Sequence, residues 1–292
     1  MKKALSLALA FAMCLSLSAC GGGNKAPSQS NQPNPTGSSS PAGAGSQSNQ
    51  PSQPASESDL EYVKSKGTLI VGMTDFAPMD YKHSSGEWIG FDADMAKLFA
   101  ESLGVEVEFL ELADWDAKSM ELDTKSIDVV WNGMTLTDDV KALMSTSEPY
   151  CLNGQVVVVN KAVADQYQTK ESLSALKFAV ENGSAGAEQL DALGISYTAM
   201  QNQAAALMEV AAGASDAAVI DLLMAGAMIG EGTSYPDLTY TVQLNDEEYG
   251  VGFRKGSDLT EAFNTWWKEA YDNGMVMSTA EIYGVQESII EK

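Results

Sequence analysis

Two side-chain types that enzymes and ligand sites often use are nearly missing from this sequence. Among its 292 residues there is one histidine, His83, and one arginine, Arg254. His83 lies in a polar stretch with no nucleophile pattern beside it, and no second histidine or cysteine cluster completes a metal site. The stretch GVGFRKG lacks the glycine spacing and strand context of a dinucleotide fingerprint. We therefore expect no bound metal, no cofactor and no catalytic residues.

Cysteine is also rare, with Cys14, Cys20 and Cys151 as the three examples. A basic start and the apolar run 4–17 give residues 1–19 the shape of a secretory signal peptide, too short to remain as a membrane-spanning helix. Small residues before Cys20 and three glycines after it resemble the bacterial lipobox, which predicts lipidation of Cys20. An ordinary signal peptide with an incidental cysteine is the alternative. Cys151 then stands alone, so we expect no intrachain disulfide and a packed Cys151.

Basic residues are few, because 17 lysines and arginines stand against 40 acidic residues and give a formal net charge of −23. Nucleic acid and anionic lipid surfaces are therefore poor partners. A solvated surface is the usual explanation of such acidity, and a preference for cationic ligands is only weakly suggested by it.

Apolar residues are scarce between residues 21 and 58, where Gly, Ser, Pro, Gln, Asn and Ala dominate and SQSNQP occurs twice. Such a segment cannot bury enough apolar surface to fold, so residues 20–58 are predicted to be a lipidated, disordered tether. A coil of this length reaches roughly 35 Å. That reach would let an anchored domain search for a partner on the same membrane.

Strands and helices are predicted to alternate from residue 60 onward, which is the pattern of an α/β protein with mainly parallel sheets. The expected strands are 68–73, 105–109, 128–131, 155–159, 177–181, 196–200, 217–220, 240–243 and 249–253. The expected helices are 60–66, 91–103, 115–125, 186–193, 204–213, 222–229, 259–273 and 278–283. Two α/β lobes follow, with sites at the carboxyl ends of strands that face a cleft.

The stretch 127–160 is the centre of this organisation. A buried strand is followed by a predicted tight turn through Asn132 and Gly133, the hydroxyls of Thr135 and Thr137, and a short helix that opens at Asp138. Backbone amides, hydroxyls and a helix N-terminus at one strand end can meet a polar or anionic group. The stretch therefore predicts a ligand-binding loop.

Seven segments occur in the order of a known family. They are GTLIVGMTDFAPMDY, GEWIGFDADMAKLFAESLGVEVEFLEL, WDAKSMELDTKSIDVVWNGMTLT, EPYCLNGQVVVVNK, AVENGSAGAE, DAAVIDLLMAG and YGVGFRKGSDLTEAFN. Together they resemble the extracytoplasmic solute-binding proteins of ABC importers, of the polar amino-acid type with the type II periplasmic-binding fold. The resemblance covers essentially all of residues 60–284.

The resemblance implies two lobes joined by a two-strand hinge. Residues 60–159 plus 249–292 would form the first lobe and residues 160–248 the second. Few stiff constraints then cross the cleft, so a ligand that touches both lobes shifts the balance toward a closed form. It also implies a monomer outside the cytoplasm that hands a small polar or cationic amino acid, or a related amine, to a membrane permease.

The family's ligand residues carry over position by position. They are Phe76, Trp115, Asn132, Gly133, Met134 and Thr135 in the first lobe, and Asn182, Gly183, Ser184 and Asp221 in the second. Asp75 and Asp80, which flank Phe76, and the aromatic Trp131 are further candidates, because carboxylates and aromatic rings suit a cationic ligand. By this resemblance Asp221 pairs with a ligand ammonium group. Phe76 and Trp131 are equally residue types of a core, and the two aspartates near Phe76 can instead cap their loop.

One departure bears on the ligand. The family's arginine for the ligand α-carboxylate falls on Val140, and Arg254 lies in another segment. Lys141 can supply a point charge instead, the turn amides and helix N-terminus can hold a carboxylate alone, or the ligand can lack an α-carboxylate. Two functions from other classes also stay open, an enzyme on the same fold that resembles cyclohexadienyl dehydratase and a ligand sensor without transport.

Overall fold

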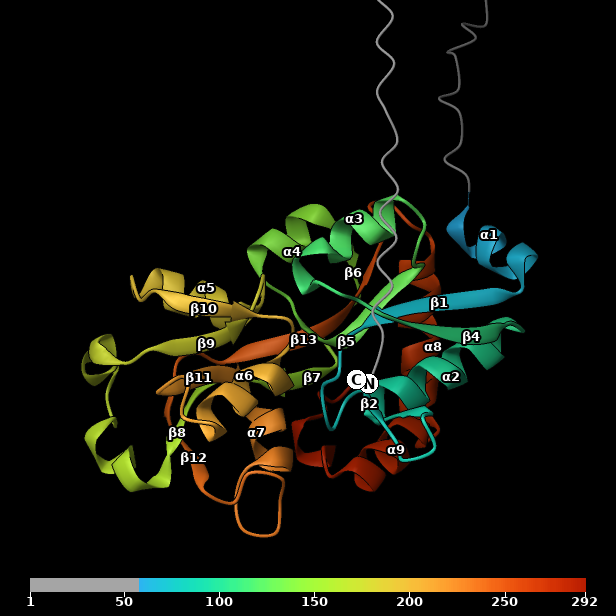
Figure 1. The fold of residues 1–292 in the computed structure, drawn as a ribbon. Coiled ribbons are helices and arrows are strands. Elements are labelled where there is room, and N and C mark those ends of the chain that lie inside the picture. The colour runs from blue at the N-terminus through green and yellow to red at the C-terminus, as the bar shows by residue number, and fades with distance from the viewer. Residues whose placement is uncertain (1–57) are drawn as a thin grey trace, which may run out of the picture. The chain divides into compact units, whose positions relative to one another are not determined.

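The computed structural model describes residues 58–292, which lie within one compact unit. Two large sheets, each flanked by helices, make up this part of the chain (Figure 1). The predicted signal peptide 1–19, the lipidation of Cys20 and all of the predicted tether except Ser58 lie outside the described residues. Ser58 itself belongs to the fold, since its hydroxyl accepts a hydrogen bond from Glu61 N and caps the first helix.

The first sheet has the strand order β4-β1-β5-β13-β6, with β7 also paired to β13. Its strands are β1 (Thr68–Met73), β4 (Glu106–Glu111), β5 (Val129–Thr135), β6 (Ser145–Thr146), β7 (Cys151–Asn153) and β13 (Glu247–Phe253). β4, β1 and β5 are parallel, and β13 runs antiparallel to β5. The accompanying helices are α1 (Asp59–Lys66), α2 (Phe91–Leu103), α3 (Lys118–Asp123), α4 (Asp138–Leu143), α8 (Leu259–Asp272) and α9 (Met275–Tyr283). We call this the first lobe.

The second sheet has the order β10-β9-β11-β8-β12. Its strands are β8 (Gln155–Asn160), β9 (Phe178–Glu181), β10 (Tyr197–Met200), β11 (Ala217–Asp221) and β12 (Leu238–Gln243), and its helices are α5 (Ala185–Ala192), α6 (Gln203–Ala211) and α7 (Leu222–Met228). β10, β9 and β11 are parallel, whereas β8 and β12 run antiparallel to their neighbours. This is the second lobe (Figure 1).

Smaller elements complete the described chain. They are the two-stranded sheet of β2 (Tyr81–Lys82) and β3 (Trp88–Ile89) and the 3-10 helices Trp115–Ala117, Lys161–Gln166, Lys170–Ala175 and Gln286–Ser288. Within residues 58–292, every helix is too short or too polar to cross a membrane.

The chain crosses between the sheets twice, after Asn153 and after Gln243. The sequence prediction kept the strand 155–159 in the first lobe, but β8 pairs with β11 and β12 of the second sheet. The physical reason is the run of four valines at 156–159, which is buried throughout and so belongs to a central strand with neighbours on both sides. The first crossing therefore lies earlier in the chain than predicted.

The alternation of strands and helices that the sequence predicted is confirmed, and one local prediction is wrong. Asn132 and Gly133 do not form a turn, because β5 continues through both to Thr135 and pairs there with β13. Gly133 keeps the positive φ of 53° that a turn glycine would have. The register between β5 and β13 shifts between Gly250 and Gly252, so the irregularity is a bulge inside a strand pair. The expected helix 115–125 is also shorter, as a 3-10 turn followed by α3.

Aromatic side chains fill the core of the first lobe between the sheet and α8. Trp131 is fully buried there, with its ring 5.0 Å from that of Phe263 at an interplanar angle of 87°. Phe99 and Trp267 also lie against it. Edge-to-face packing of this kind stabilises a core beyond the burial of area alone. It also fixes the rigid wall from which the strand ends of the first lobe project.

Candidate functional site

A cavity of about 320 Å³ is lined by residues of both lobes. It opens at the carboxyl ends of strands, where an α/β fold usually forms its site. Ten of the residues that the sequence singled out line it, namely Phe76, Trp115, Asn132, Gly133, Met134, Thr135, Asn182, Gly183, Ser184 and Asp221.

Four singled-out residues do not line this cavity. Trp131 is enclosed in the aromatic core and Lys141 is exposed on α4. Asp80 is fully buried, and burial, followed by the nearby Asp92 carboxylate, raises its pKa well above the ordinary value. Asp75 is half-buried, and its pKa is raised by burial and then by Glu111.

The Asn132 side chain is used within the protein. Its Oδ1 accepts from Thr74 N at 3.0 Å and Thr74 Oγ1 at 2.9 Å, and its Nδ2 donates to Asp80 Oδ2 at 2.8 Å. The Gly133 backbone amide, which the sequence predicted to bind the ligand, donates instead to Asp92 Oδ2 at 2.6 Å. Burial raises the pKa of Asp92 to about 7, against the opposing effect of hydrogen bonds from Tyr150 and Gly133. Both groups therefore stabilise the end of β5. Neither the Asn132 side-chain amide nor the Gly133 backbone amide is free to bind a ligand.

Asp221 ends β11 and is buried against four hydrogen-bond donors. Its Oδ1 accepts from Gln155 Nε2 at 2.9 Å, from Tyr249 Oη at 2.7 Å and from Asn153 Nδ2, while Oδ2 accepts from Gln203 Nε2. Burial, and then the neighbouring Glu247 carboxylate, raise the pKa of Asp221 well above its ordinary value. The donors fix where the carboxylate points but supply no positive charge.

Glu247 is the second acid of this cluster, and sequence reasoning missed it. Glu247 Oε1 accepts hydrogen bonds from Asn153 Nδ2 at 2.5 Å and from Gln155 Nε2 at 2.8 Å. The same two amides also donate to Asp221. Asn153 pairs with Glu247 in the first sheet, and Gln155 pairs with Asp221 in the second. We call these four residues the hinge quartet. The sequence feature that could have identified them is their position next to the strands predicted to cross between the lobes.

Polar contacts join the lobes near the cavity. Asn182 Nδ2 donates to Asp114 Oδ1 at 3.0 Å, and Lys118 Nζ donates to the Gly183 carbonyl oxygen at 3.2 Å. Thr74 Oγ1 lies 3.3 Å from Glu181 Oε1. Each pairs a residue of the first lobe with one of the second, so the structure has a closed arrangement of the lobes.

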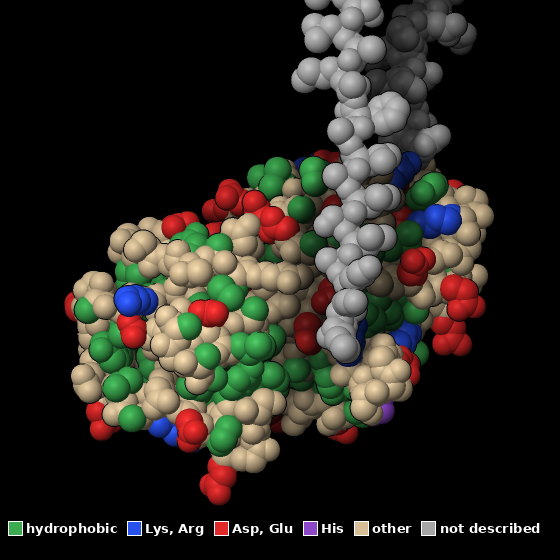
Figure 2. Space-filling model, in the orientation of Figure 1, with side chains coloured by type: hydrophobic (Ala, Val, Ile, Leu, Met, Phe, Trp, Pro, Cys, Tyr) green, Lys and Arg blue, Asp and Glu red, His purple; other side chains and the backbone are tan. Residues whose placement is uncertain are grey.

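Acidic side chains dominate the cavity wall. They are Asp116, Asp139, Glu181, Glu188, Asp191 and Asp221, and Lys118 is the one basic residue that lines it within the described part of the chain. Burial raises the pKa of Glu181 to about 8, while the Lys118 ammonium acts in the opposite direction. Acidic side chains are also spread over the face of the molecule drawn in Figure 2, where basic ones are few. The cavity therefore suits a ligand with positive charge.

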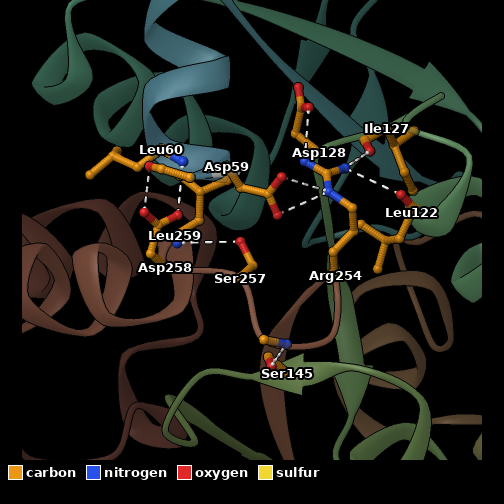
Figure 3. Close-up of polar contacts among 12 residues, drawn as sticks. Asp59, Leu60, Leu122, Ile127, Asp128, Ser145, Arg254, Ser257, Asp258 and Leu259 are labelled. Carbon is orange, nitrogen blue, oxygen red and sulfur yellow. Dashed lines mark hydrogen bonds and ion pairs between the residues drawn. The ribbon is translucent and has the colours of Figure 1, made fainter. Parts of the chain in front are cut away.

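Arg254 takes no part in the cavity. It follows β13, and its Nε contacts both carboxylate oxygens of Asp59 at 3.0 Å (Figure 3). Its Nη1 donates to the carbonyl oxygens of Ile127 at 2.8 Å and Leu122 at 3.2 Å, and Nη2 lies 3.5 Å from Asp128 Oδ1. The position that the resemblance gives to an arginine holds Val140, which lines the cavity and packs in an apolar cluster.

Residues 58–292 contain no group of three or more His, Cys, Asp and Glu side chains that could hold a metal ion. Cys151 is buried and unbonded to another cysteine, and burial, then Asp92, raise the pKa of its thiol. A buried thiol with a raised pKa is a poor nucleophile.

Two α/β lobes, two crossings and a polar cavity between the lobes define a ligand-binding protein of the type II periplasmic-binding fold. The model of the bacterial extracellular solute-binding proteins, family 3, matches residues 69–286. The chain belongs to this family.

Several characterised proteins are similar to this chain. The L-cystine-binding protein TcyJ of Escherichia coli is 29% identical over 231 residues, which cover 78% of this chain and 86% of that protein. The arginine-binding extracellular protein ArtP of Bacillus subtilis is 32% identical, covering 75% and 86%. Among solved structures, an ancestral amino acid-binding protein described as a precursor of cyclohexadienyl dehydratase is 31% identical, with a TM-score of 0.70 and coverage of 77% and 99%. These relatives are named as binding proteins.

Proposed function

We propose that this protein captures a cationic amino acid, or a related amine, in the cavity between its lobes and delivers it to an ABC permease. The observation that carries the proposal is the acidic cavity wall, in which six carboxyl groups face one ammonium group. Asp221 and Glu181 are buried, whereas Asp116, Asp139, Glu188 and Asp191 are exposed to solvent. Acidic groups gathered around one cavity attract a positive ligand, and the attraction is strongest where solvent screens it least. The similar protein ArtP of Bacillus subtilis is an arginine-binding extracellular protein, which supports the same ligand class.

Asp221 is the proposed partner of the ligand ammonium group. It is buried, lines the cavity and is oriented by uncharged donors, so a ligand cation would be its natural counter-ion. Phe76 and Trp115, which line the same cavity, offer aromatic surface to the ligand. Asn182, Gly183 and Ser184 complete the proposed wall from the second lobe.

Isothermal titration calorimetry on the purified protein tests this assignment. The panel is L-arginine, L-lysine, L-histidine, L-cystine and L-glutamate, each measured at low and high salt. We expect L-arginine or L-lysine to bind with micromolar or tighter affinity and L-glutamate not to bind. Preference for L-glutamate, or no binding by any member of the panel, would reject the proposal.

Membrane attachment through Cys20 is part of the same proposal. Its support is the order of basic start, apolar run, small residues and cysteine in the sequence. Expression of the full chain in a bacterium with a labelled fatty acid should label the wild type and not the Cys20→Ser variant. Equal labelling of both proteins would reject lipidation at Cys20.

An enzyme of the dehydratase type is the second candidate. One observation favours it, because Glu181 lines the cavity with a pKa raised to about 8 and so holds a proton near neutral pH, as a general acid does. Incubation of the purified protein with each ligand it binds, followed by mass spectrometry of the small molecules, separates the candidates. We expect every ligand to be recovered unchanged.

A further inference from the structure

Among residues 58–292, Lys118 supplies the one ammonium group that lines the cavity, beside six acidic side chains. We propose that Lys118 is the receptor for the negatively charged carboxylate of the ligand, so that the guest is an α-amino acid and not a simple amine. This inference rests on the proposed function and makes its ligand class narrower. Its physical basis is the position, the hydrogen bonds and the missing counter-ion of one side chain.

Lys118 is held in place at the start of α3. Its Nζ donates to the carbonyl oxygens of Trp115 and Gly183, both at 3.2 Å, and lies 4.9 Å from the centre of the Trp115 ring. An ammonium group has three N–H donors, so these two bonds leave one donor unused. The residue is 8% exposed and lines the cavity, which is the direction left open to the third donor.

Lys118 has no ion-pair partner within the part of the chain that the structure describes, since both hydrogen-bond acceptors of its Nζ are backbone carbonyls. Its pKa is lowered by burial, and the more distant carboxylates, Asp116 first and Glu181 next, oppose that effect. A buried charge without a direct partner is costly, and an anionic ligand group would remove that cost. Because no carboxylate of the described residues is bonded directly to Lys118 Nζ, a ligand carboxylate can take that place.

Three other groups that could hold a ligand carboxylate are engaged or distant. Arg254 is bonded to Asp59 and two backbone carbonyls outside the cavity. Lys141 is exposed and does not line the cavity. The Gly133 amide donates to the buried Asp92. Lys118 is the cation that remains.

The bond from Lys118 to Gly183 links carboxylate binding to closure. Lys118 belongs to the first lobe and Gly183 to the second, so this bond exists only when the lobes are together. A carboxylate on Lys118 would lie beside this contact, and the acidic side chains of the cavity would be left for the ligand's positive groups. The carboxylate of an amino acid would then contact a positive group and its ammonium group would contact negative ones, which fixes the orientation of the ligand in the cavity.

Calorimetry with a matched ligand pair tests the inference. L-argininamide keeps the ammonium and guanidinium groups of L-arginine but replaces the carboxylate with a neutral amide. We expect the full-chain wild type to bind L-arginine more tightly than L-argininamide. Lys118→Met should weaken L-arginine binding by roughly 10- to 100-fold, the range for a lost charge-assisted hydrogen bond, and change L-argininamide binding by less than about threefold.

Three further proteins complete the design. Lys118→Arg should retain the preference for L-arginine, and Lys141→Met, which alters an exposed lysine outside the cavity, should behave as the wild type. Lys118→Gln replaces Lys118→Met if the latter fails to give a cooperative thermal transition. Each variant is melted before titration.

The outcomes separate the inference from the proposed function. A wild type that binds both ligands equally, or a Lys118→Met variant that loses both equally, overturns the role of Lys118 and leaves the proposed function standing. Loss of affinity in Lys141→Met, of the size expected for Lys118→Met, would assign the carboxylate to Lys141 instead. A wild type that binds no amino acid at all would overturn the proposed function together with this inference.

Discussion

Asp221 is a carboxylate with four hydrogen-bond donors, and none of the described residues places a cation beside it. At the scale of single residues this is the feature on which the proposed ligand class depends. Its location at the end of β11 could be predicted from the sequence, because an acidic residue there ends an apolar run. Its companions could not, since Gln155, Gln203 and Glu247 come from segments far apart in the chain.

Replacing Asp221 with asparagine removes the charge and keeps the shape. We expect Asp221→Asn to weaken binding of a cationic ligand by about 1.5–3 kcal/mol, because a charged hydrogen-bond partner is lost. Stability of the free protein should change less than affinity, because relief of repulsion with Glu247 is offset by a new amide nitrogen that faces the Gln203 donor. Calorimetry and thermal melts measure both quantities, with the exposed Asp123→Asn as the control. Unchanged affinity would contradict the role of Asp221.

Glu181 makes stability depend on pH. Burial raises its pKa to about 8 in the folded protein from a reference value of 4.5. The folded state then holds a proton that the unfolded state has lost, so this group's contribution to stability falls as pH rises from about 4.5 to about 8. Over this pH range the free energy of unfolding should fall less in Glu181→Gln than in the wild type, by on the order of 1–3 kcal/mol.

Denaturant titrations of wild type and Glu181→Gln at pH 5 and pH 8.5 measure this difference. Asp221 and Asp92, whose pKa values are also raised, remain in both proteins, so some loss should persist in the variant. If the free energy of unfolding changes by the same amount between the two pH values in both proteins, Glu181 is already ionised in the folded state.

At the scale of elements, strand β13 connects segments that are far apart in the sequence. It pairs with β5, β6 and β7, and Arg254 directly after it bonds to Asp59 of α1 and to the segment before β5 (Figure 3). One planar guanidinium can serve acceptors from several segments because its donors point in fixed directions. The sole arginine of the chain is thus a structural residue.

We expect Arg254→Met to lower the free energy of unfolding by about 3–5 kcal/mol, because buried Asp59 and Asp128 lose a partner. Ligand affinity of the folded fraction should not change, since Arg254 does not line the cavity. Lys268→Met is the control: its ion pair with Asp272 is exposed and is worth less than about 1 kcal/mol. A similar loss in both variants would show that the buried network adds nothing.

At this scale, local sequence patterns predicted the elements but not all of the strand pairing. Periodicity predicted the helices and strands because each depends on local residue spacing. The continuation of β5 through Asn132 and Gly133 was not predictable locally, because it depends on pairing with β13, which lies more than a hundred residues later. The sheet to which β8 belongs is likewise decided by distant partners.

At the scale of the whole molecule, closure brings two loops to within side-chain contact. A Cβ added at Gly183 would lie 2.6 Å from Asp116 Cβ, in the opposite lobe, and Gly183 has a φ of +64°. Closure as seen here therefore requires a residue without a side chain at this position.

Gly183→Ala should weaken ligand binding by about tenfold or more, because the added methyl group holds the lobes apart. Gly194→Ala is a matched control, since Gly194 has a φ of +68° and open space around it. Both variants carry similar backbone strain and should lose similar thermal stability. Small-angle scattering should show ligand-induced compaction in Gly194→Ala and a reduced change in Gly183→Ala. Equal compaction in both variants would rule out a steric block at Gly183.

The hinge quartet lies where the chain passes from one sheet to the other, with Asn153 and Glu247 on one side and Gln155 and Asp221 on the other. Both amides donate to both acids, so these bonds span the pivot itself. A cation that engages Asp221 draws on the same lone pairs that Asn153 and Gln155 use. A ligand cation on Asp221 would therefore weaken these hydrogen bonds, and the charge of the ligand would change how easily the lobes rotate about the crossing strands.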